Sequence, residues 1–349
     1  MERKLGIIGY GRMGSWHAES VNSRINGLTV CAAFDIDPER CKAAENDGIK
    51  VYATIEEFFA SGIDLVLVAT PNNFHKHYCI LAMEAGLDVV CEKPACMNCE
   101  EFEEVVAVAE KTGRFFTVHQ NRRYDIDYAV VREIINKKLV GNVTFIDSRL
   151  TGSRGCSTAW RSTYDNGGGA LYDWGIHLID QILFLVDSKP KYVFAELQHL
   201  MYSEVDDGGR IIIGFENGVK AQIVFDFWCF IPENRWRISG DDGTATLYDW
   251  FKTDGKVIKA NQEVEMERGC VYTPNGLSTT MWPRPKQEII ELEPPKVEKE
   301  PRWEEFYENV LQVLDGKAKP FVTHEQVRSS MKVMMSAFES DRTKTTVHF

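Results

Sequence analysis

Short apolar runs alternate with amphipathic segments between residues 4 and 121 of this chain. Five runs have the composition of strands: 4–8, 28–34, 64–70, 88–94 and 114–121. Three segments between them have helical spacing: 15–22, 72–86 and 99–113. The run 64–70 is apolar at nearly every position, as in a parallel strand that is covered on both faces. The alternation predicts an α/β fold with a doubly wound parallel sheet.

The pattern changes after residue 122. Two further helices are predicted, at 127–141 and 167–187, and the strands that accompany them are 142–152, 191–200, 210–215, 219–228, 235–240 and 244–250. The turn sequences at 216–218 and 241–243 each end in glycine and favour hairpins. A linker at 294–302 precedes two closing helices, near 302–316 and 323–340. We therefore expect a nucleotide-binding domain at 1–122 and an α/β domain with a mostly antiparallel open sheet at 123–349.

Composition narrows the function further. A chain of 349 residues with net charge −12 and no basic stripe argues against nucleic acid as a partner. No apolar run approaches the ~20 residues that span a bilayer, and no signal pattern opens the chain. Nine cysteines, an odd number, indicate reduced thiols and a cytoplasmic protein. The lone pair Cys96 and Cys99 is interpreted as structural, because no second such pair supplies further metal ligands.

The first candidate site is the loop Gly9-Tyr10-Gly11-Arg12-Met13-Gly14, which lies between a predicted strand and a predicted helix. Gly9 allows a tight turn, Gly11 lets a pyrophosphate approach the backbone, and Gly14 lets the helix pack on the sheet. Asp35, 21 residues after Gly14, ends the second strand and suits the hydroxyls of an adenosine ribose. A 2′-phosphate would be repelled there, so NAD is favoured over NADP.

The second candidate site joins two distant segments. Asp173, His177 and Asp180 are spaced so that one helix face carries all three, and Lys93 follows a parallel strand at the sheet edge where ligands bind. A lysine there can stabilise an alkoxide, and a histidine can exchange a proton near neutrality. The alternatives are a capped helix whose histidine bonds an aspartate, and a lysine that reaches solvent. No metal is expected, because no third strong ligand accompanies His177.

These pieces together resemble the Gfo/Idh/MocA oxidoreductases from about residue 4 to residue 187. The resemblance rests on the glycine loop at 9–14, Asp35, ATPNNFH at 69–75, EKP at 92–94, Trp160-Arg161 and GGGALYDWGIHLID at 167–180. It implies that Lys93, Asp173 and His177 are catalytic, with His177 as acid/base on a substrate hydroxyl. It implies further cofactor contacts from Thr70, Pro71, Asn72, His75, Glu92, Lys93, Gln120, Trp160 and Arg161. Arg122 and Tyr124 would join the catalytic three in contacting substrate.

The implied activity is an NAD-dependent transfer of hydride between the nicotinamide and a hydroxyl-bearing carbon of a sugar, cyclitol or glycoside. The open sheet of the second domain would form a homodimer or homotetramer. One alternative is a glycoside-cleaving enzyme that oxidises its substrate transiently and releases the aglycone by elimination. Another is a sensor that binds NAD without turnover, against which the complete set of Lys93, Asp173 and His177 argues.

Overall fold

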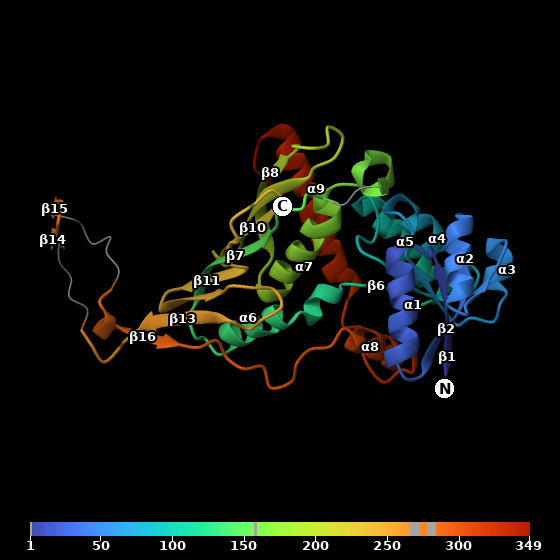
Figure 1. Ribbon diagram of the computed structural model, residues 1–349, viewed down its shortest axis with the longest axis horizontal. Coiled ribbons are helices and arrows are strands. Elements are labelled where there is room, and N and C mark those ends of the chain that lie inside the picture. Colours follow the sequence, from blue (N-terminus) through green and yellow to red (C-terminus); the bar gives the residue numbers. More distant parts are fainter. Residues whose placement is uncertain (1, 157–158, 266–271, 278–283) are drawn as a thin grey trace.

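The computed structural model describes residues 2–156, 159–265, 272–277 and 284–349. Its first sheet has six parallel strands in the order β3-β2-β1-β4-β5-β6 (Figure 1). The strands are β1 (Arg3–Ile8), β2 (Leu28–Phe34), β3 (Lys50–Val51), β4 (Leu65–Val68), β5 (Asp88–Cys91) and β6 (Phe116–Val118). Every residue of β4 is buried, as expected for a parallel strand between two helical layers.

Five helices connect these strands: α1 (Arg12–Arg24), α2 (Pro38–Asn46), α3 (Ile55–Phe59), α4 (His75–Glu84) and α5 (Cys99–Thr112). The predicted parallel sheet is confirmed, but the sequence analysis missed α2, β3 and α3. Of the residues in α2 only Ala44 is buried, so this helix lacks the apolar stripe by which helices are recognised. Its start is instead fixed locally, because the Asp37 side chain accepts a hydrogen bond from Glu39 N at 2.9 Å.

The second sheet has nine strands in the order β16-β13-β12-β11-β7-β10-β9-β8-β17. These are β7 (Val143–Thr151), β8 (Pro190–Gln198), β9 (Gly208–Phe215), β10 (Lys220–Asp226), β11 (Trp236–Gly240), β12 (Gly243–Leu247), β13 (Gly255–Ala260), β16 (Ile289–Leu292) and β17 (Val347–His348). Neighbouring strands are antiparallel except for the parallel pair β7 and β10. Both predicted hairpins are present, as β9–β10 and β11–β12. The short hairpin of β14 (Tyr272–Thr273) and β15 (Gly276–Leu277) lies apart from both sheets in Figure 1.

The helices α6 (Ile126–Asn136), α7 (Ile176–Leu185), α8 (Glu304–Leu314) and α9 (His324–Thr343) complete the fold. The last two return to the first sheet: Thr117 Oγ1 donates to Val322 O, and the Tyr307 hydroxyl of α8 lies 2.8 Å from His17 Nδ1 of α1. These contacts hold the first sheet against the second part of the chain. Among the described residues, no helix combines the length and apolarity that a membrane span requires.

Candidate functional site

The loop after β1 has the shape of a phosphate cradle. Gly9 has φ +91°, and a Cβ there would lie 2.7 Å from Ala69 O; a Cβ on Gly14 would lie 2.1 Å from Gly9 O. A Cβ on Gly11 would meet no atom within 4 Å, so the space beside this glycine is open. α1 begins directly after Gly11, and its first N–H groups and positive dipole end are suited to an anion. The residues therefore fit a dinucleotide.

Asp35 lies beside this cradle, as the sequence predicts. Its Oδ2 accepts a hydrogen bond from Tyr10 N at 2.7 Å, and its Oδ1 accepts one from Asp37 N at 2.9 Å. The carboxylate is thereby fixed at the carboxyl edge of β2. Ile36 follows with 82% of its surface exposed, which leaves apolar surface next to the acid. The Tyr10 side chain, in contrast, is buried and donates to Asp47 Oδ2 at 2.7 Å.

The resemblance assigns the segment after β4 to the cofactor. In the structure, two side chains of this segment contact backbone carbonyls of the protein. Asn72 is buried and donates from Nδ2 to Gly167 O at 2.8 Å. His75 is fully buried, with Nδ1 2.7 Å from Pro94 O and Nε2 3.0 Å from Thr70 O. Both of its ring nitrogens contact backbone carbonyls, and a contact of His75 with the cofactor stays a prediction. The His75 ring fixes the loops before and after β5.

Lys93, which follows β5 of the first sheet, contacts Asp173, which lies in the turn before α7. Lys93 follows β5 and precedes Pro94 through a cis peptide bond; its Nζ donates to Asp173 O at 2.7 Å and to Asp173 Oδ1 at 3.0 Å. Arg161 Nε lies 3.2 Å from the same Oδ1. Burial acts to raise the pKa of Asp173, but the Lys93 and Arg161 charges outweigh it and lower that pKa below its ordinary value. The site thus contains an ionised carboxylate between two cations.

His177 lies one helical turn after Asp173 and is 5% exposed. Burial, followed by the charges of Lys93 and Arg122, lowers the pKa of His177 well below its ordinary value. Its Nδ1 has no hydrogen-bond partner among the residues that the structure describes. At neutral pH the site therefore holds an uncharged imidazole, which can accept a proton.

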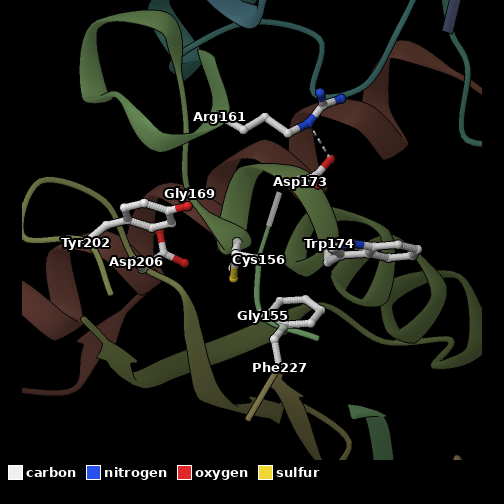
Figure 2. A pocket seen from close by; sticks show the side chains of 10 residues that line it. Gly155, Cys156, Arg161, Gly169, Asp173, Trp174, Tyr202, Asp206 and Phe227 are labelled. Carbon is white, nitrogen blue, oxygen red and sulfur yellow. Dashed lines mark ion pairs between the residues drawn. The ribbon is translucent and has the colours of Figure 1, made fainter. Parts of the chain in front are cut away.

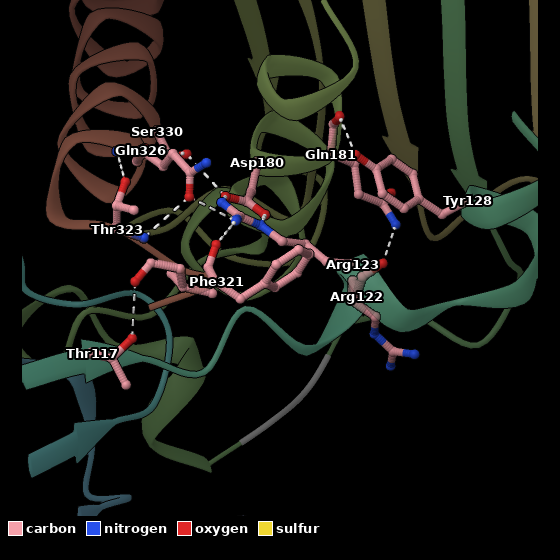
Figure 3. A network of polar contacts seen from close by, with 11 residues as sticks. Thr117, Arg122, Arg123, Tyr128, Asp180, Gln181, Phe321, Thr323, Gln326 and Ser330 are labelled. Carbon is pink, nitrogen blue, oxygen red and sulfur yellow. Dashed lines mark hydrogen bonds and ion pairs between the residues drawn. The ribbon is translucent and has the colours of Figure 1, made fainter. Parts of the chain in front are cut away.

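Asp180 belongs to a different cluster from Asp173 and His177. Residues Leu171–Gly175 form a π-helical turn before α7, which changes the angular spacing on which the shared helix face was predicted. Asp180 is buried and pairs bidentately with Arg123, at 2.7 Å for both contacts (Figure 3). Arg123 also donates to Gln326 Oε1 at 2.9 Å, which ties α7 to α9. The prediction that one face carries all three side chains is wrong for Asp180.

The residues that follow β6 point in different directions. The Arg122 guanidinium carbon lies 4.6 Å from the Trp250 ring and 5.3 Å from the Trp174 ring, and its carbonyl accepts from Gln181 Nε2 (Figure 3). Tyr124 packs on Phe321 at 5.5 Å between ring centroids. It lines a surface pocket with Arg132, Pro301, Glu305 and Asn309, and this pocket shares no residue with the one that Asp173 lines. Tyr124 thus lies outside the cavity that Asp173 lines, and its contact with substrate stays a prediction.

Three further residues that the resemblance assigns to the cofactor are Gln120, Trp160 and Arg161. Gln120 is 2% exposed, and its Oε1 has no hydrogen-bond partner among the described residues. The Arg161 guanidinium carbon lies 4.3 Å from the Trp160 ring. Arg161 therefore contacts both the Trp160 ring and the Asp173 carboxylate. It connects the segment 159–162 to Asp173, which the resemblance implies is catalytic.

A cavity opens beside Asp173 (Figure 2). Its walls come from the loops after β7, β8 and β10 and from the π-helical turn; they are Gly155, Cys156, Arg161, Gly169, Ala170, Asp173, Trp174, Tyr202, Asp206 and Phe227. The sequence analysis missed Cys156, Tyr202, Asp206 and Phe227. No motif surrounds them, and the strands that precede them are far apart in sequence, so only the folded sheet edge brings them together.

Glu92, beside Lys93, is directed into the interior. Its Oε1 lies 2.7 Å from His17 Nε2 and 2.9 Å from His119 Nδ1. These three donors lie within 4.8 Å of one another, a spacing that admits a metal site. Ligands of one zinc ion, each about 2.0–2.1 Å from it, would be about 3.3 Å apart. The shorter distances are those of hydrogen bonds, so Glu92 accepts ring N–H groups. The cofactor contact that the resemblance implies for Glu92 stays a prediction.

The cradle and the two-part junction at Lys93 define a nucleotide-binding oxidoreductase with a Rossmann domain. Comparison with protein-family models agrees. Residues 3–120 match the oxidoreductase family with an NAD-binding Rossmann fold, and residues 128–246 match the GFO/IDH/MocA C-terminal domain. The chain belongs to the Gfo/Idh/MocA family of oxidoreductases.

Individual relatives cover most of the chain. A solved NAD-binding protein from Listeria innocua is 38% identical, with TM-score 0.93 over 100% of this chain and 99% of that one. The scyllo-inositol 2-dehydrogenase (NADP(+)) IolW of Bacillus subtilis is 26% identical over 354 residues, covering 99% of this chain and 95% of its own length. The rhizopine catabolism protein MocA of Rhizobium meliloti is 31% identical over 188 residues, 54% of this chain and 58% of its own.

Proposed function

We propose that the protein is an NAD-dependent dehydrogenase that transfers a hydride between the nicotinamide and a hydroxyl-bearing carbon of a sugar, cyclitol or glycoside. The observation that carries this proposal is the contact of Lys93 Nζ with Asp173 Oδ1 at 3.0 Å. This contact joins Lys93, at the carboxyl edge of the first sheet, to Asp173, which lines the cavity beside the second sheet. In this proposal residues 1–122 bind cofactor, and residues 123–349 bind substrate and form a homodimer or homotetramer.

Each side chain has a separate task in the reaction. When bound, NAD supplies the hydride acceptor, and the protein handles the proton. His177, uncharged at neutral pH, accepts the proton of the substrate hydroxyl in oxidation and returns it in reduction. Lys93 donates a hydrogen bond to the same oxygen and stabilises its developing negative charge. Asp173 holds the Lys93 ammonium in place through the ion pair at Oδ1, and Arg161 fixes the Asp173 carboxylate through a second ion pair.

The preference for NAD rests on Asp35. Its carboxylate is fixed by two backbone N–H groups beside the cradle, where a ribose hydroxyl can donate to it. A 2′-phosphate in that position would face a negative charge and no arginine, since Ile36 and Asp37 follow. This distinguishes the present proposal from the NADP(+) given in the name of the relative from Bacillus subtilis.

The first experiment is a screen of sugars, inositols and glycosides with NAD, in which absorbance reports NADH formation. Net NADH with an oxidised product supports the proposal. Cleaved glycoside with NAD regenerated would instead support redox-assisted elimination. If NAD binds but no compound gives NADH or a cleaved product, the dehydrogenase proposal fails and a sensor role is favoured.

The variant His177→Ala tests the proton acceptor. We expect turnover to fall by about 10²–10⁴, the usual contribution of general acid–base catalysis, while the Kd for NAD stays within a few-fold of wild type. His77→Ala is the matched control, because His77 is exposed on α4. Turnover of His177→Ala equal to that of the control would remove His177 from the mechanism.

A further inference from the structure

Asp206 is a buried carboxyl group at the cavity beside Asp173 that no predicted role includes. It lies in the loop between β8 and β9, and 3% of its surface is exposed. In Figure 2, Asp206 and Tyr202 lie on one side of the cavity and Trp174 on the other, with the ion pair of Arg161 and Asp173 apart from both. The cavity is thus lined by a second carboxyl group, that of Asp206, which is separate from the ion pair of Arg161 and Asp173.

The backbone brings this carboxyl into the wall of the cavity. Asp206 Oδ2 accepts a hydrogen bond from Leu171 N at 2.7 Å, and its carbonyl accepts one from Ala170 N at 2.9 Å. Oδ1 would lie 2.4 Å from a Cβ on Gly169, which has φ +112°. Only glycine leaves room for Oδ1 in this place. Asp206 is therefore fixed to the first residues of the π-helical turn that carries Asp173.

The surroundings of Asp206 suit a ligand that donates hydrogen bonds. No cation is paired with this carboxyl in the described structure, whereas Asp173 has two. Burial, with a smaller contribution from Asp207, raises the pKa of Asp206 to about 7. Near neutrality this buried carboxyl is thus only partly ionised, and a substrate carboxylate beside it would add a negative charge or require a proton.

We propose that Asp206 determines substrate specificity by accepting a hydrogen bond from a hydroxyl or amino group remote from the oxidised carbon. The enzyme then oxidises neutral or amino-substituted polyols and discriminates against sugar acids. This inference rests on the proposed dehydrogenase function, and it adds the substrate class and a specificity-determining residue. Tyr202 and Trp174 form the walls between which the polyol lies.

The test compares three probes, an inositol, an amino-substituted inositol and a sugar acid, in wild type and in Asp206→Asn. The asparagine keeps an acceptor oxygen for Leu171 N and removes the charge. Asp254→Asn is the control, because Asp254 is exposed on the loop between β12 and β13 and its substitution makes the same change in net charge. We expect wild type to favour the inositol and its amino derivative over the acid by at least about tenfold in kcat/KM, because a buried polar group without its hydrogen-bond partner disfavours the competing substrate.

In Asp206→Asn we expect the ratio of kcat/KM for the amino probe to that for the acid to fall about tenfold or more, with the Kd for NAD unchanged. A purely structural role would lower activity on all three probes equally. That outcome, or a wild-type preference for the acid, would overturn the inference.

Failure of the dehydrogenase proposal gives a different result. If none of the three probes is oxidised, their binding to the NADH complex is measured by calorimetry. Binding of the polyols that weakens in Asp206→Asn and not in Asp254→Asn supports the subsite and rejects the reaction. Equal binding to both variants, or no binding to wild type, overturns the subsite.

Discussion

Two carboxylates lie on either side of Lys93 in this fold, and they have opposite surroundings. Asp173 has 18% of its side chain exposed, pairs with Lys93 and Arg161, and borders a cavity. Glu92 has 6% of its side chain exposed and is enclosed by His17, His119 and the Tyr307 hydroxyl that contacts His17. Asp173 therefore faces the cavity, whereas Glu92 faces the junction between α1 and α8.

The charge of each group is maintained by a different mechanism. Two cations lower the pKa of Asp173 against the effect of burial. The pKa of Glu92 is also well below its ordinary value despite burial, because His119 and His17 direct ring nitrogens at its carboxylate within hydrogen-bond distance. Glu92 Oε2 additionally accepts from Lys93 N at 3.2 Å. The comparison indicates that Asp173 fixes the Lys93 side chain and that Glu92 supports the Lys93 backbone.

The largest expected effect is a loss of turnover, and it concerns Lys93, the partner of the more exposed carboxylate Asp173. Lys93→Met removes the cation that contacts Asp173, and we expect turnover to fall by about 10²–10⁴ with the Kd for NAD nearly unchanged. Lys76→Met on α4 is the control, because Lys76 makes only surface ion pairs, with Glu101 and Glu104. Steady-state kinetics on a substrate from the screen checks this. A Lys93→Met protein that forms NADH at the wild-type rate would remove Lys93 from the chemistry.

A smaller effect, on stability, is expected for the enclosed carboxylate. Glu92→Gln removes the charge that strengthens the two buried hydrogen bonds to Oε1 and replaces Oε2, which accepts from Lys93 N, with an amide donor. We expect the free energy of unfolding to fall by about 3 kcal/mol. The Kd for NAD should change by less than a few-fold, because the Glu92 side chain does not face the cradle. Glu104→Gln, at a side chain 58% exposed, should change stability by less than about 0.5 kcal/mol. Unchanged stability together with a large loss of NAD affinity would support the cofactor contact that the resemblance implies.

The last prediction is a dependence of the free energy of unfolding on pH. Burial lowers the pKa of His17 to about 4, and the pKa of His177 is also lowered, so below pH 6.5 the unfolded chain takes up protons that the folded chain does not. The free energy of unfolding should therefore be full above pH 6.5 and fall from pH 6.5 towards pH 4, by up to about 1.4 kcal/mol per pH unit for each histidine. Urea unfolding at several pH values measures this. A stability that rises as the pH falls through this window would contradict the assigned burial.

Local sequence patterns predicted the elements and their order well. The glycine loop, the buried strand β4 and the two glycine-ended hairpins each carry their own steric requirement, so neighbouring residues suffice to recognise them. The missed elements lack such a signal. α2 has a nearly uniform polar surface, and β13 and β16 are partly exposed strands near a sheet edge.

Part of the candidate site could also be predicted from the sequence. Lys93, Asp173 and His177 could be selected because the end of a parallel strand and a helix face are recurrent places for chemistry. The direction of a side chain depends on partners that are distant in the chain. Glu92 meets His17 and His119, Asp180 meets Arg123, and none of these pairings follows from spacing. The cavity residue Asp206 depends in the same way on how β7, β9 and β10 come together.

The most direct test of the central claim is a crystal structure of the complex with NAD and a polyol found in the screen. The account predicts that the oxygen of the oxidised carbon lies within hydrogen-bond distance of both Lys93 Nζ and the His177 ring, about 2.6–3.2 Å, with the carbon facing the nicotinamide. A polyol whose reacting oxygen contacts neither group would contradict it.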